Sequence, residues 1–379
     1  MIIEKEKLLK EKIIKIGLER RKKLHFIAFI KFYAMIKIIK WHIYNWKLKQ
    51  IDYGARMCEI LFISSGFLVG YNYYKKKISC NYETSFRYSY KHLRNFYPLL
   101  TINTIYNFFI ISKLKNINLT YIEILISNLI MINSWSRYSR LASIFNGISW
   151  FLSALIFCYF LVPFLLNGIQ NIKRSLSLFV LVALIRITSE EIIYKGALNI
   201  FDANFHRGPI IRLLEFFLGM LLIPTFFRVD LFLVRYKDYF ILKYIFTIFQ
   251  ILFPVCIYYI MLIYNNILHR CIFVLIFSFF IFVLSFDYGY LSDLFSYIYI
   301  DKIMSCQMEI YLIQNTINNI FYNIINKRKF EKVFNNEVQF VIKLHIIFII
   351  AYLYKIFLKE KLANYFDIIL FKLKKLILD

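Results

Sequence analysis

The chain has 379 residues, of which 60% are hydrophobic and 19% charged, and its formal net charge is +25. Soluble domains usually hold about 45–50% apolar residues, so this composition excludes an ordinary soluble domain and indicates a chain that lies mostly in lipid. The charge does not indicate nucleic-acid binding, because the Lys and Arg residues lie mainly at the two ends and between apolar segments, where anionic lipids and the positive-inside rule account for them.

The N-terminal segment is basic. Residues 1–23 hold nine Lys and Arg residues and no apolar run followed by a small-residue cleavage site. This pattern is not that of a secretory signal. It predicts a basic cytoplasmic segment over residues 1–24.

Apolar segments long enough to cross a bilayer, which takes about 20 helical residues, recur from residue 26 almost to the C-terminus. They are apolar on all sides and do not alternate with period two, which favours helices over a lipid-facing barrel. We predict an all-α fold, a polytopic integral membrane helix bundle of about ten transmembrane helices over residues 25–358, and a basic cytoplasmic tail over residues 359–379. The expected spans are residues 26–44, 57–74, 96–111, 148–167, 175–187, 210–227, 239–263, 271–284, 308–325 and 341–358.

The eleven residues 122–132 are apolar too, but they cover only about 17 Å at helical rise, which is short for a crossing. Ten crossings place both ends of the chain and the basic residues between 75 and 94 in the cytoplasm, as the positive-inside rule favours. The same count leaves the basic cluster at residues 327–332 outside. An eleventh crossing at residues 122–132 would instead place the basic tail outside.

The six cysteines are scattered and show no metal-ligand spacing. The sequence also lacks a nucleotide-binding loop, a Gly-x-Ser-x-Gly elbow and a paired carboxylate motif. We therefore predict no metal site and no bound cofactor.

Charged residues within a bilayer are costly, so those in the first span are functional candidates. Lys31 and His42 are eleven positions apart. Eleven helical steps of 100° return to within about 20° of the starting face, about 16 Å further along. The two side chains should therefore share one stripe.

This pair and four longer stretches resemble the membrane-bound acyltransferase family 3, whose first span carries an Arg, ten intervening residues and a His. Lys31 stands at the Arg position and His42 at the His position. The stretches, which follow the family's order, are Glu59-Ile-Leu-Phe-Ile-Ser-Ser-Gly-Phe-Leu-Val-Gly70, Phe145-Asn-Gly-Ile-Ser-Trp-Phe-Leu-Ser-Ala-Leu-Ile-Phe-Cys-Tyr-Phe-Leu-Val-Pro163, Arg212-Leu-Leu-Glu-Phe-Phe-Leu-Gly-Met220 and Glu309-Ile-Tyr-Leu-Ile-Gln314.

The resemblance implies an enzyme, an acyltransferase transferring groups other than amino-acyl groups, in the bacterial cytoplasmic (inner) membrane with its N-terminus inside. It would move an acyl group, most simply acetyl, from cytoplasmic acyl-CoA to a hydroxyl of a surface polysaccharide or lipid-linked glycan. His42 would be catalytic, as general base or as acyl carrier, and Lys31 would support it. Acyl-CoA is thus a substrate, and membrane lipids are the other expected partner.

The segment before the third span ends in Tyr-Pro, as in the family, but His92 and Asn95 replace its usual arginines. We predict that Lys91, His92 and Arg94 bind the donor, since fixed positive charge can hold the phosphates of coenzyme A. The alternative for Lys91 and Arg94 is that they only hold this segment on the cytoplasmic side, as the positive-inside rule describes.

Four further residues are assigned to the acceptor or to structure: Ser149, Trp150, Arg212 and Gln314. For Ser149 and Trp150 the alternative is helix packing. For Arg212 it is a local ion pair with Glu215, three residues along the same helix. Gln314 replaces the usual His of the family.

Two other functions remain open. A glycan or lipid-linked sugar transporter could line its pathway with the same polar stripe, although such proteins usually show internal repeats, and none is visible here. A degenerate, inactive member of the family is the other alternative, because several motif positions are altered.

Overall fold

The computed structural model describes residues 23–44, 53–76, 78–112, 119–135, 145–194, 207–236, 239–262, 267–328 and 336–378. Over these ranges the regular structure is helical throughout, which confirms the predicted all-α class. The helices are α2 (His25–Tyr44), α3 (Tyr53–Tyr73), α4 (Tyr82–Leu93), α5 (Tyr97–Ser112), α6 (Leu119–Leu129), α8 (Ser149–Leu165), α9 (Ile172–Tyr194), α10 (Pro209–Leu221), α11 (Ile223–Leu233), α12 (Phe240–Leu262), α13 (Ile267–Leu284), α14 (Tyr290–Phe295), α15 (Ile298–Met304), α16 (Gln307–Arg328), α17 (Asn336–Leu353) and α18 (Lys359–Leu378).

Within the described ranges, four helices are long and apolar enough to cross a membrane: Ser149–Ile169, Pro209–Tyr236, Phe240–Ile260 and Glu337–Lys372. The predicted count of ten spans is therefore not confirmed. The first span coincides with α2, but that helix carries Lys31, Lys37 and Lys40, and the third, α5, has only 16 residues. The short apolar segment at residues 122–132 overlaps α6, which has 11 residues.

The predicted span over residues 210–227 lies within the candidate span Pro209–Tyr236, which is interrupted at one turn residue, Leu222, between α10 and α11. α10 ends at Leu221 and α11 begins at Ile223, with Pro224 in its first turn. Proline lacks the backbone N–H that an interior helical position donates, and it fits the first turn of a helix. The break at Leu222 therefore follows from Pro224.

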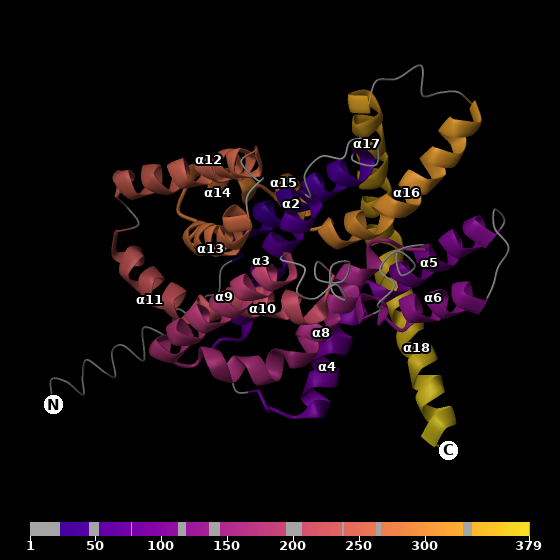
Figure 1. Ribbon diagram of the computed structural model, residues 1–379, viewed down its shortest axis with the longest axis horizontal. Helices are drawn as coiled ribbons and strands as arrows, with labels where there is room; N and C mark the ends of the chain where they lie inside the picture. Colours follow the sequence, from indigo (N-terminus) through magenta and orange to yellow (C-terminus); the bar gives the residue numbers. More distant parts are fainter. Residues whose placement is uncertain are drawn as a thin grey trace.

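The centre of the molecule is the crossing of α3 and α10, which Figure 1 shows among α2, α8 and α9. A Cβ atom on Gly66 would lie 1.8 Å from the carbonyl oxygen of Phe216, and one on Gly219 would lie 1.9 Å from that of Ile63. Gly66 and Gly70 form a Gly-x-x-x-Gly pattern, which lets helix backbones approach closely. These glycines set the distance between the two helices.

The N-terminal end of α2 is fixed by a residue far along the chain. Both carboxylate oxygens of Asp287 accept hydrogen bonds, at 2.9 Å, from the backbone N–H groups of His25 and Phe26. The first N–H groups of a helix have no partner within the helix, so a carboxylate there satisfies them and favours the helix dipole. Lys23 also pairs with Asp301 of α15. These contacts fix the position of the helix that carries Lys31 and His42.

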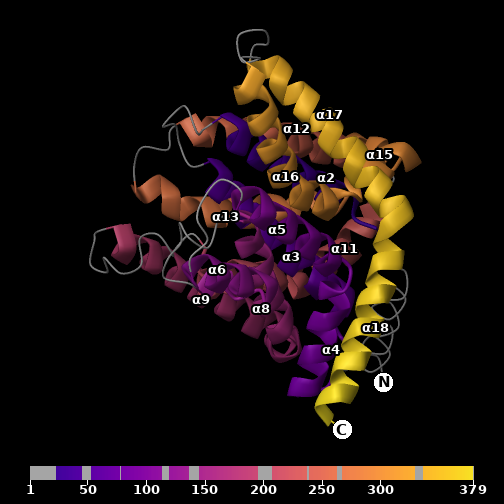
Figure 2. The same ribbon diagram turned by 90° about the vertical axis from the view of Figure 1, so that its right-hand side faces the viewer.

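The segment predicted as a cytoplasmic tail is helical to Leu378. α17 and α18 are joined by a π-helical segment, Tyr354–Leu358, and run as one long rod along a border of the molecule (Figure 2). The rod packs on α4 and α5: the Tyr97 and Phe366 rings are 4.7 Å apart between centroids. α18 is therefore part of the fold.

Candidate functional site

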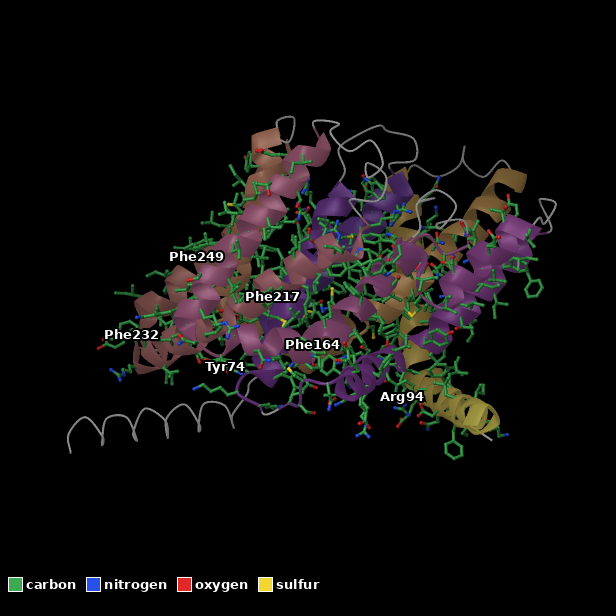
Figure 3. All side chains as sticks on the ribbon, turned by 60° about the horizontal axis from the view of Figure 1, so that its bottom comes forward. Tyr74, Arg94, Phe164, Phe217, Phe232 and Phe249 are labelled. Carbon is green, nitrogen blue, oxygen red and sulfur yellow. The ribbon has the colours of Figure 1, made fainter. Side chains whose placement is uncertain are left out.

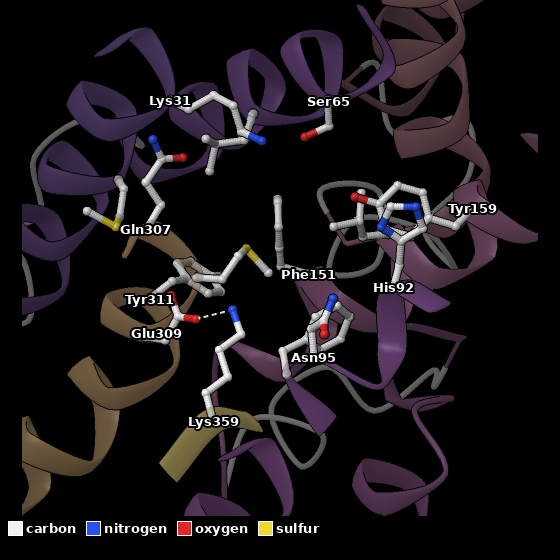
Figure 4. Close-up of a pocket in the computed structure, with 15 residues that line it drawn as sticks. Lys31, Ser65, His92, Asn95, Phe151, Tyr159, Gln307, Glu309, Tyr311 and Lys359 are labelled. Atoms are coloured by element: carbon white, nitrogen blue, oxygen red, sulfur yellow. Dashed lines mark hydrogen bonds and ion pairs between the residues drawn. The ribbon is translucent and has the colours of Figure 1, made fainter. Parts of the chain in front are cut away.

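A cavity of about 210 Å³ lies among α2, α3, α8, α16, the join of α4 and α5, and the start of α18. Figure 4 shows its polar side chains pointing inward from these separate elements. The lining residues are Lys31, Met35, Leu61, Ser65, His92, Asn95, Phe96, Phe151, Leu155, Tyr159, Gln307, Met308, Glu309, Tyr311 and Lys359.

The cavity is where the resembling stretches meet. Stretches 59–70, 145–163 and 309–314 each contribute lining residues, as do the first span and the segment before the third span. The stretch 212–220 lies elsewhere and belongs to a buried ion-pair cluster. Parts of the chain more than 200 residues apart are thus brought to one space.

Lys31 reaches the cavity from the middle of α2, opposite Ser65 of α3, and the two polar ends point toward one another (Figure 4). Within the described part of the chain, no carboxylate pairs with Lys31. The only carboxylate among the described lining residues is that of Glu309, whose Oε1 accepts from Lys359 Nζ at 2.6 Å. A bound anion would therefore meet an uncompensated ammonium group.

His92, at the end of α4, brings an imidazole to the same cavity. Its ring stacks on Tyr159, 4.3 Å between centroids with 28° between the planes, and lies against Tyr88. Burial, and then the nearby charges of Lys91 and Lys31, lower the pKa of His92 to about 4. His92 is thus neutral at neutral pH, and its Nε2 has no hydrogen-bond partner among the described residues.

The other two residues predicted to bind the donor differ from one another. Arg94 is held by α18: its Nε donates to Asp367 Oδ2 and its Nη2 to Asn364 Oδ1, both at 2.6 Å. Tyr90 bonds the same aspartate, and Figure 3 shows Arg94 beside α18. Lys91 is exposed. Arg94 therefore links α4 to α18, whereas the Lys91 side chain faces outward and is accessible to a ligand.

His42 is on α2, as predicted, but does not line the cavity. It is half-buried near the far end of the helix, edge-on to Trp41 with 4.9 Å between ring centroids. Arg207 lies within electrostatic reach of both His42 and Tyr311. Tyr311 does line the cavity. Tyr311 and His42 thus have Arg207 as a common neighbouring charge.

Arg212 and Glu215 form the local ion pair weighed from the sequence, with Arg212 Nη1 2.5 Å from Glu215 Oε2. The pair extends into a cluster across α3, α9 and α10 in which three arginines face three glutamates. The further pairs are Arg56–Glu59, Arg56–Glu190, Arg186–Glu59, Arg186–Glu190 and Arg186–Glu215. The number of arginines equals the number of glutamates, so the charges compensate one another. The cluster is therefore a structural feature of the bundle centre.

Ser149 and Trp150 are engaged in packing contacts. The Ser149 hydroxyl has two acceptors for its one proton, Asn128 Oδ1 at 2.5 Å and the Asn146 carbonyl oxygen at 2.7 Å, and it accepts from Asn133 Nδ2 at 2.6 Å. Trp150 lies under Arg212, whose guanidinium carbon is 5.8 Å from the ring centroid. These contacts hold the N-terminal end of α8 in place.

Gln314 is buried one turn along α16 from Tyr311. Neither its amide nitrogen nor its amide oxygen has a hydrogen-bond partner within the part of the chain that the structure describes. It does not line the cavity. No group of three or more His, Cys, Asp or Glu residues is placed to hold a metal ion among the described residues.

Several lining residues were not singled out from the sequence. Ser65, Tyr159, Glu309 and Tyr311 all lie inside the resembling stretches, so the signal was present, but helical spacing alone does not show which faces meet. Lys359 belongs to the segment predicted as a tail.

No protein-family model, no curated protein and no solved structure matches this chain.

Proposed function

We propose that the protein is a membrane-bound O-acyltransferase that moves an acyl group, most simply acetyl, from cytoplasmic acyl-CoA to a hydroxyl of a surface or lipid-linked glycan. One observation carries this proposal: the first span, the segment before the third span and three of the resembling stretches converge on one cavity that presents an uncompensated ammonium group. A cavity of this charge suits an anionic donor.

In this mechanism Lys31 holds an anionic or polarised oxygen of the donor by a charge-assisted hydrogen bond. Lys91 attracts the coenzyme A phosphates from the outer side of α4, and Arg94 supports the site by holding α18 in place. His42 lies about 16 Å from Lys31 along α2, from eleven residues at helical rise. Because coenzyme A has a long pantetheine arm, one donor molecule can span this distance.

His42 acts on the acceptor, either as the base that takes the hydroxyl proton or as a transient acyl carrier, since an imidazole can do both. The uncharged amides and hydroxyls beside the N-terminal end of α8, with Gln314, suit contacts with sugar hydroxyls. Donor and acceptor would thus approach along one face of α2 from opposite ends.

The proposal includes a multi-pass topology of about ten spans in the bacterial cytoplasmic membrane, with the N-terminus inside. The apolar helices support a membrane location, and the basic residues of α4 support a cytoplasmic position for this helix. This orientation places Lys91 and the cavity toward the cytoplasm, where coenzyme A is present, and His42 toward the outer side.

The test is acyl transfer in isolated membranes supplied with labelled acetyl-CoA and the cell's own surface polysaccharide. Lys31→Met should lower kcat/KM about 10- to 100-fold, the size of a lost hydrogen bond to a charged group, while Lys31→Arg should retain activity. Lys37→Met is the matched control, because Lys37 lies on the same helix over the Tyr33 ring, 5.2 Å from its centroid.

Label in the polysaccharide of wild-type membranes is the expected result. Its absence would overturn the acyltransferase assignment. Movement of a lipid-linked glycan across the membrane without acylation would indicate the transporter instead.

A further inference from the structure

Tyr311 is a lining residue of the cavity that shares a neighbouring charge with His42. Its side chain is 3% exposed and lines the cavity. Arg207 lies within electrostatic reach of its hydroxyl and also of His42.

The Tyr311 hydroxyl makes one long hydrogen bond and could form a stronger one with a closer acceptor. It donates to the carbonyl oxygen of Ile148 at 3.4 Å. Hydrogen bonds between oxygen atoms are usually about 2.7–2.8 Å long, so this bond is weak. A buried hydroxyl with a weak bond gains free energy when a closer acceptor arrives, and most when that acceptor is charged.

Three sources of positive charge lie near this hydroxyl: a helix N-terminus and two guanidinium groups. Ile148 precedes the first residue of α8, a helix of 17 residues whose N-terminal end has no side-chain cap. Helix N-termini carry a partial positive charge. Arg207 and Arg212 both lie within electrostatic reach of Tyr311, although Arg212 is also paired with Glu215. A donor hydroxyl, a helix N-terminus and nearby guanidinium groups thus gather at one end of the cavity.

We propose that the Tyr311 hydroxyl stabilises the oxyanion formed at the acyl carbonyl during transfer, so that the reaction takes place at the α8 end of the cavity. This inference rests on the proposed acyltransferase function. The group developing negative charge in acyl transfer is the carbonyl oxygen, and a preorganised donor aimed at it in a dry site is a strong source of catalysis.

In the general-base version of the reaction, the acceptor hydroxyl oxygen forms a bond to the acyl carbon while His42 takes its proton. The carbonyl electrons move to oxygen, which accepts the hydrogen bond from Tyr311. The carbonyl then re-forms, the carbon–sulfur bond breaks, and the coenzyme A thiolate receives the proton from His42. Tyr311 keeps its own proton throughout.

The decisive variant is Tyr311→Phe, which removes one oxygen atom and leaves the buried ring in place. In the membrane assay with labelled acetyl-CoA and surface polysaccharide, kcat should fall about 10²- to 10³-fold, as when an oxyanion donor is removed, while KM for acetyl-CoA changes little. Binding of an acetyl-CoA analogue with a non-transferable acyl group should be unchanged.

Tyr354→Phe is the matched control. Tyr354 is a buried tyrosine whose hydroxyl has no partner among the described residues, and it does not line the cavity. This variant should keep wild-type kcat. A structural role for the Tyr311 hydroxyl would instead lower the thermal stability and weaken binding of the analogue.

The outcomes separate the two proposals. An unchanged kcat in Tyr311→Phe, or a loss confined to KM, overturns the role of Tyr311 and leaves the acyltransferase assignment in place. Wild-type membranes that transfer no acyl group overturn both. A fall in kcat with unchanged binding of the analogue supports the oxyanion role.

Discussion

Gly66 of α3 lies against the backbone of α10 so closely that a Cβ atom would come within 1.8 Å of the Phe216 carbonyl oxygen. Neither backbone can move without separating two helices at the centre of the bundle. Gly66→Ala should therefore lower the free energy of unfolding by about 1–3 kcal/mol or more, the usual cost of overpacking. Thermal unfolding in detergent measures the change. Gly168→Ala is the control, because the nearest atom there is the tip of the Phe217 ring at 2.9 Å, and equal stability of the two variants would contradict the prediction.

Arg186 is the hub of the buried ion-pair cluster, since its guanidinium group contacts Glu59, Glu190 and Glu215. Arg186→Met leaves these carboxylates undercompensated in a buried site. Breaking a buried ion pair from one side costs about 3–5 kcal/mol, so the variant should unfold at a much lower temperature or fail to accumulate in membranes.

The control for this cluster is Arg87→Met. Arg87 pairs with Glu83 on the exposed side of α4, and exposed pairs contribute at most about 1 kcal/mol. A loss of stability as large in the control as in Arg186→Met would show that the cluster has no special role.

His42→Ala should abolish glycan acylation and leave expression and membrane insertion intact, because His42 is half-buried near the end of α2 and only its imidazole would do chemistry. His345→Ala, on α17, should acylate normally, since among the described residues that ring bonds the Val341 carbonyl one turn earlier. Labelled polysaccharide is the measurement. Equal labelling by His42→Ala and wild type would refute the assignment of His42.

The neutral state of His92 predicts the pH dependence of donor binding. Its pKa is lowered to about 4, so the imidazole gains charge only as the pH falls through about 4. The groups that face it are Tyr88 and Lys91 of α4, Tyr159 of α8 and Lys31 of α2, with the Glu309–Lys359 pair on the same cavity.

KM for acetyl-CoA should therefore stay level from about pH 7 to about pH 5, because His92 adds no positive charge in that interval. A histidine with the ordinary pKa of 6.5 would gain charge near that pH and bind the anionic donor more tightly below it. His92→Gln gives the reference profile. A KM that falls below pH 6.5 in wild type but not in His92→Gln would show that His92 is a cation there.

The proposed orientation places the segment between α3 and α4 in the cytoplasm. A cysteine introduced by Lys76→Cys, in a Cys80→Ser background that removes an exposed native thiol, should react with an impermeant reagent only after the membrane is opened. Labelling in intact cells would reverse the topology and separate Lys91 from the coenzyme A pool.

Much of the local structure could be predicted from the sequence. The first expected span, residues 26–44, differs from α2 by one residue at its start, because its apolar run has clear limits. The Arg212–Glu215 pair follows from helical spacing alone. The division of α10 from α11 could also have been predicted, since Pro224 marked it, but the apolar run is unbroken there.

The tertiary relationships could not be predicted in this way. Arg94 and Asp367 are 273 positions apart, and Arg186 and Glu59 are 127 apart. Spacing shows which residues share a face of one helix, but not which faces of different helices meet. For this reason the sequence predicts that Arg94 binds the donor, whereas Arg94 is paired with α18. It also predicts that Lys359 lies in a tail, whereas Lys359 lines the cavity.

The rod formed by α17, the π-helical segment and α18 also limits where the bilayer can lie. The candidate span within it, the helix Glu337–Lys372, has 36 residues, which measure about 54 Å at helical rise. A hydrocarbon core about 30 Å thick could contain this length only at a tilt of about 56°, beyond the range of about 0–40° found for membrane helices. The rod must therefore emerge into water along part of its length. Spin labels placed at successive turns of this helix would report their depth in the bilayer, and the turn at which the depth reaches zero would locate the membrane surface on this protein.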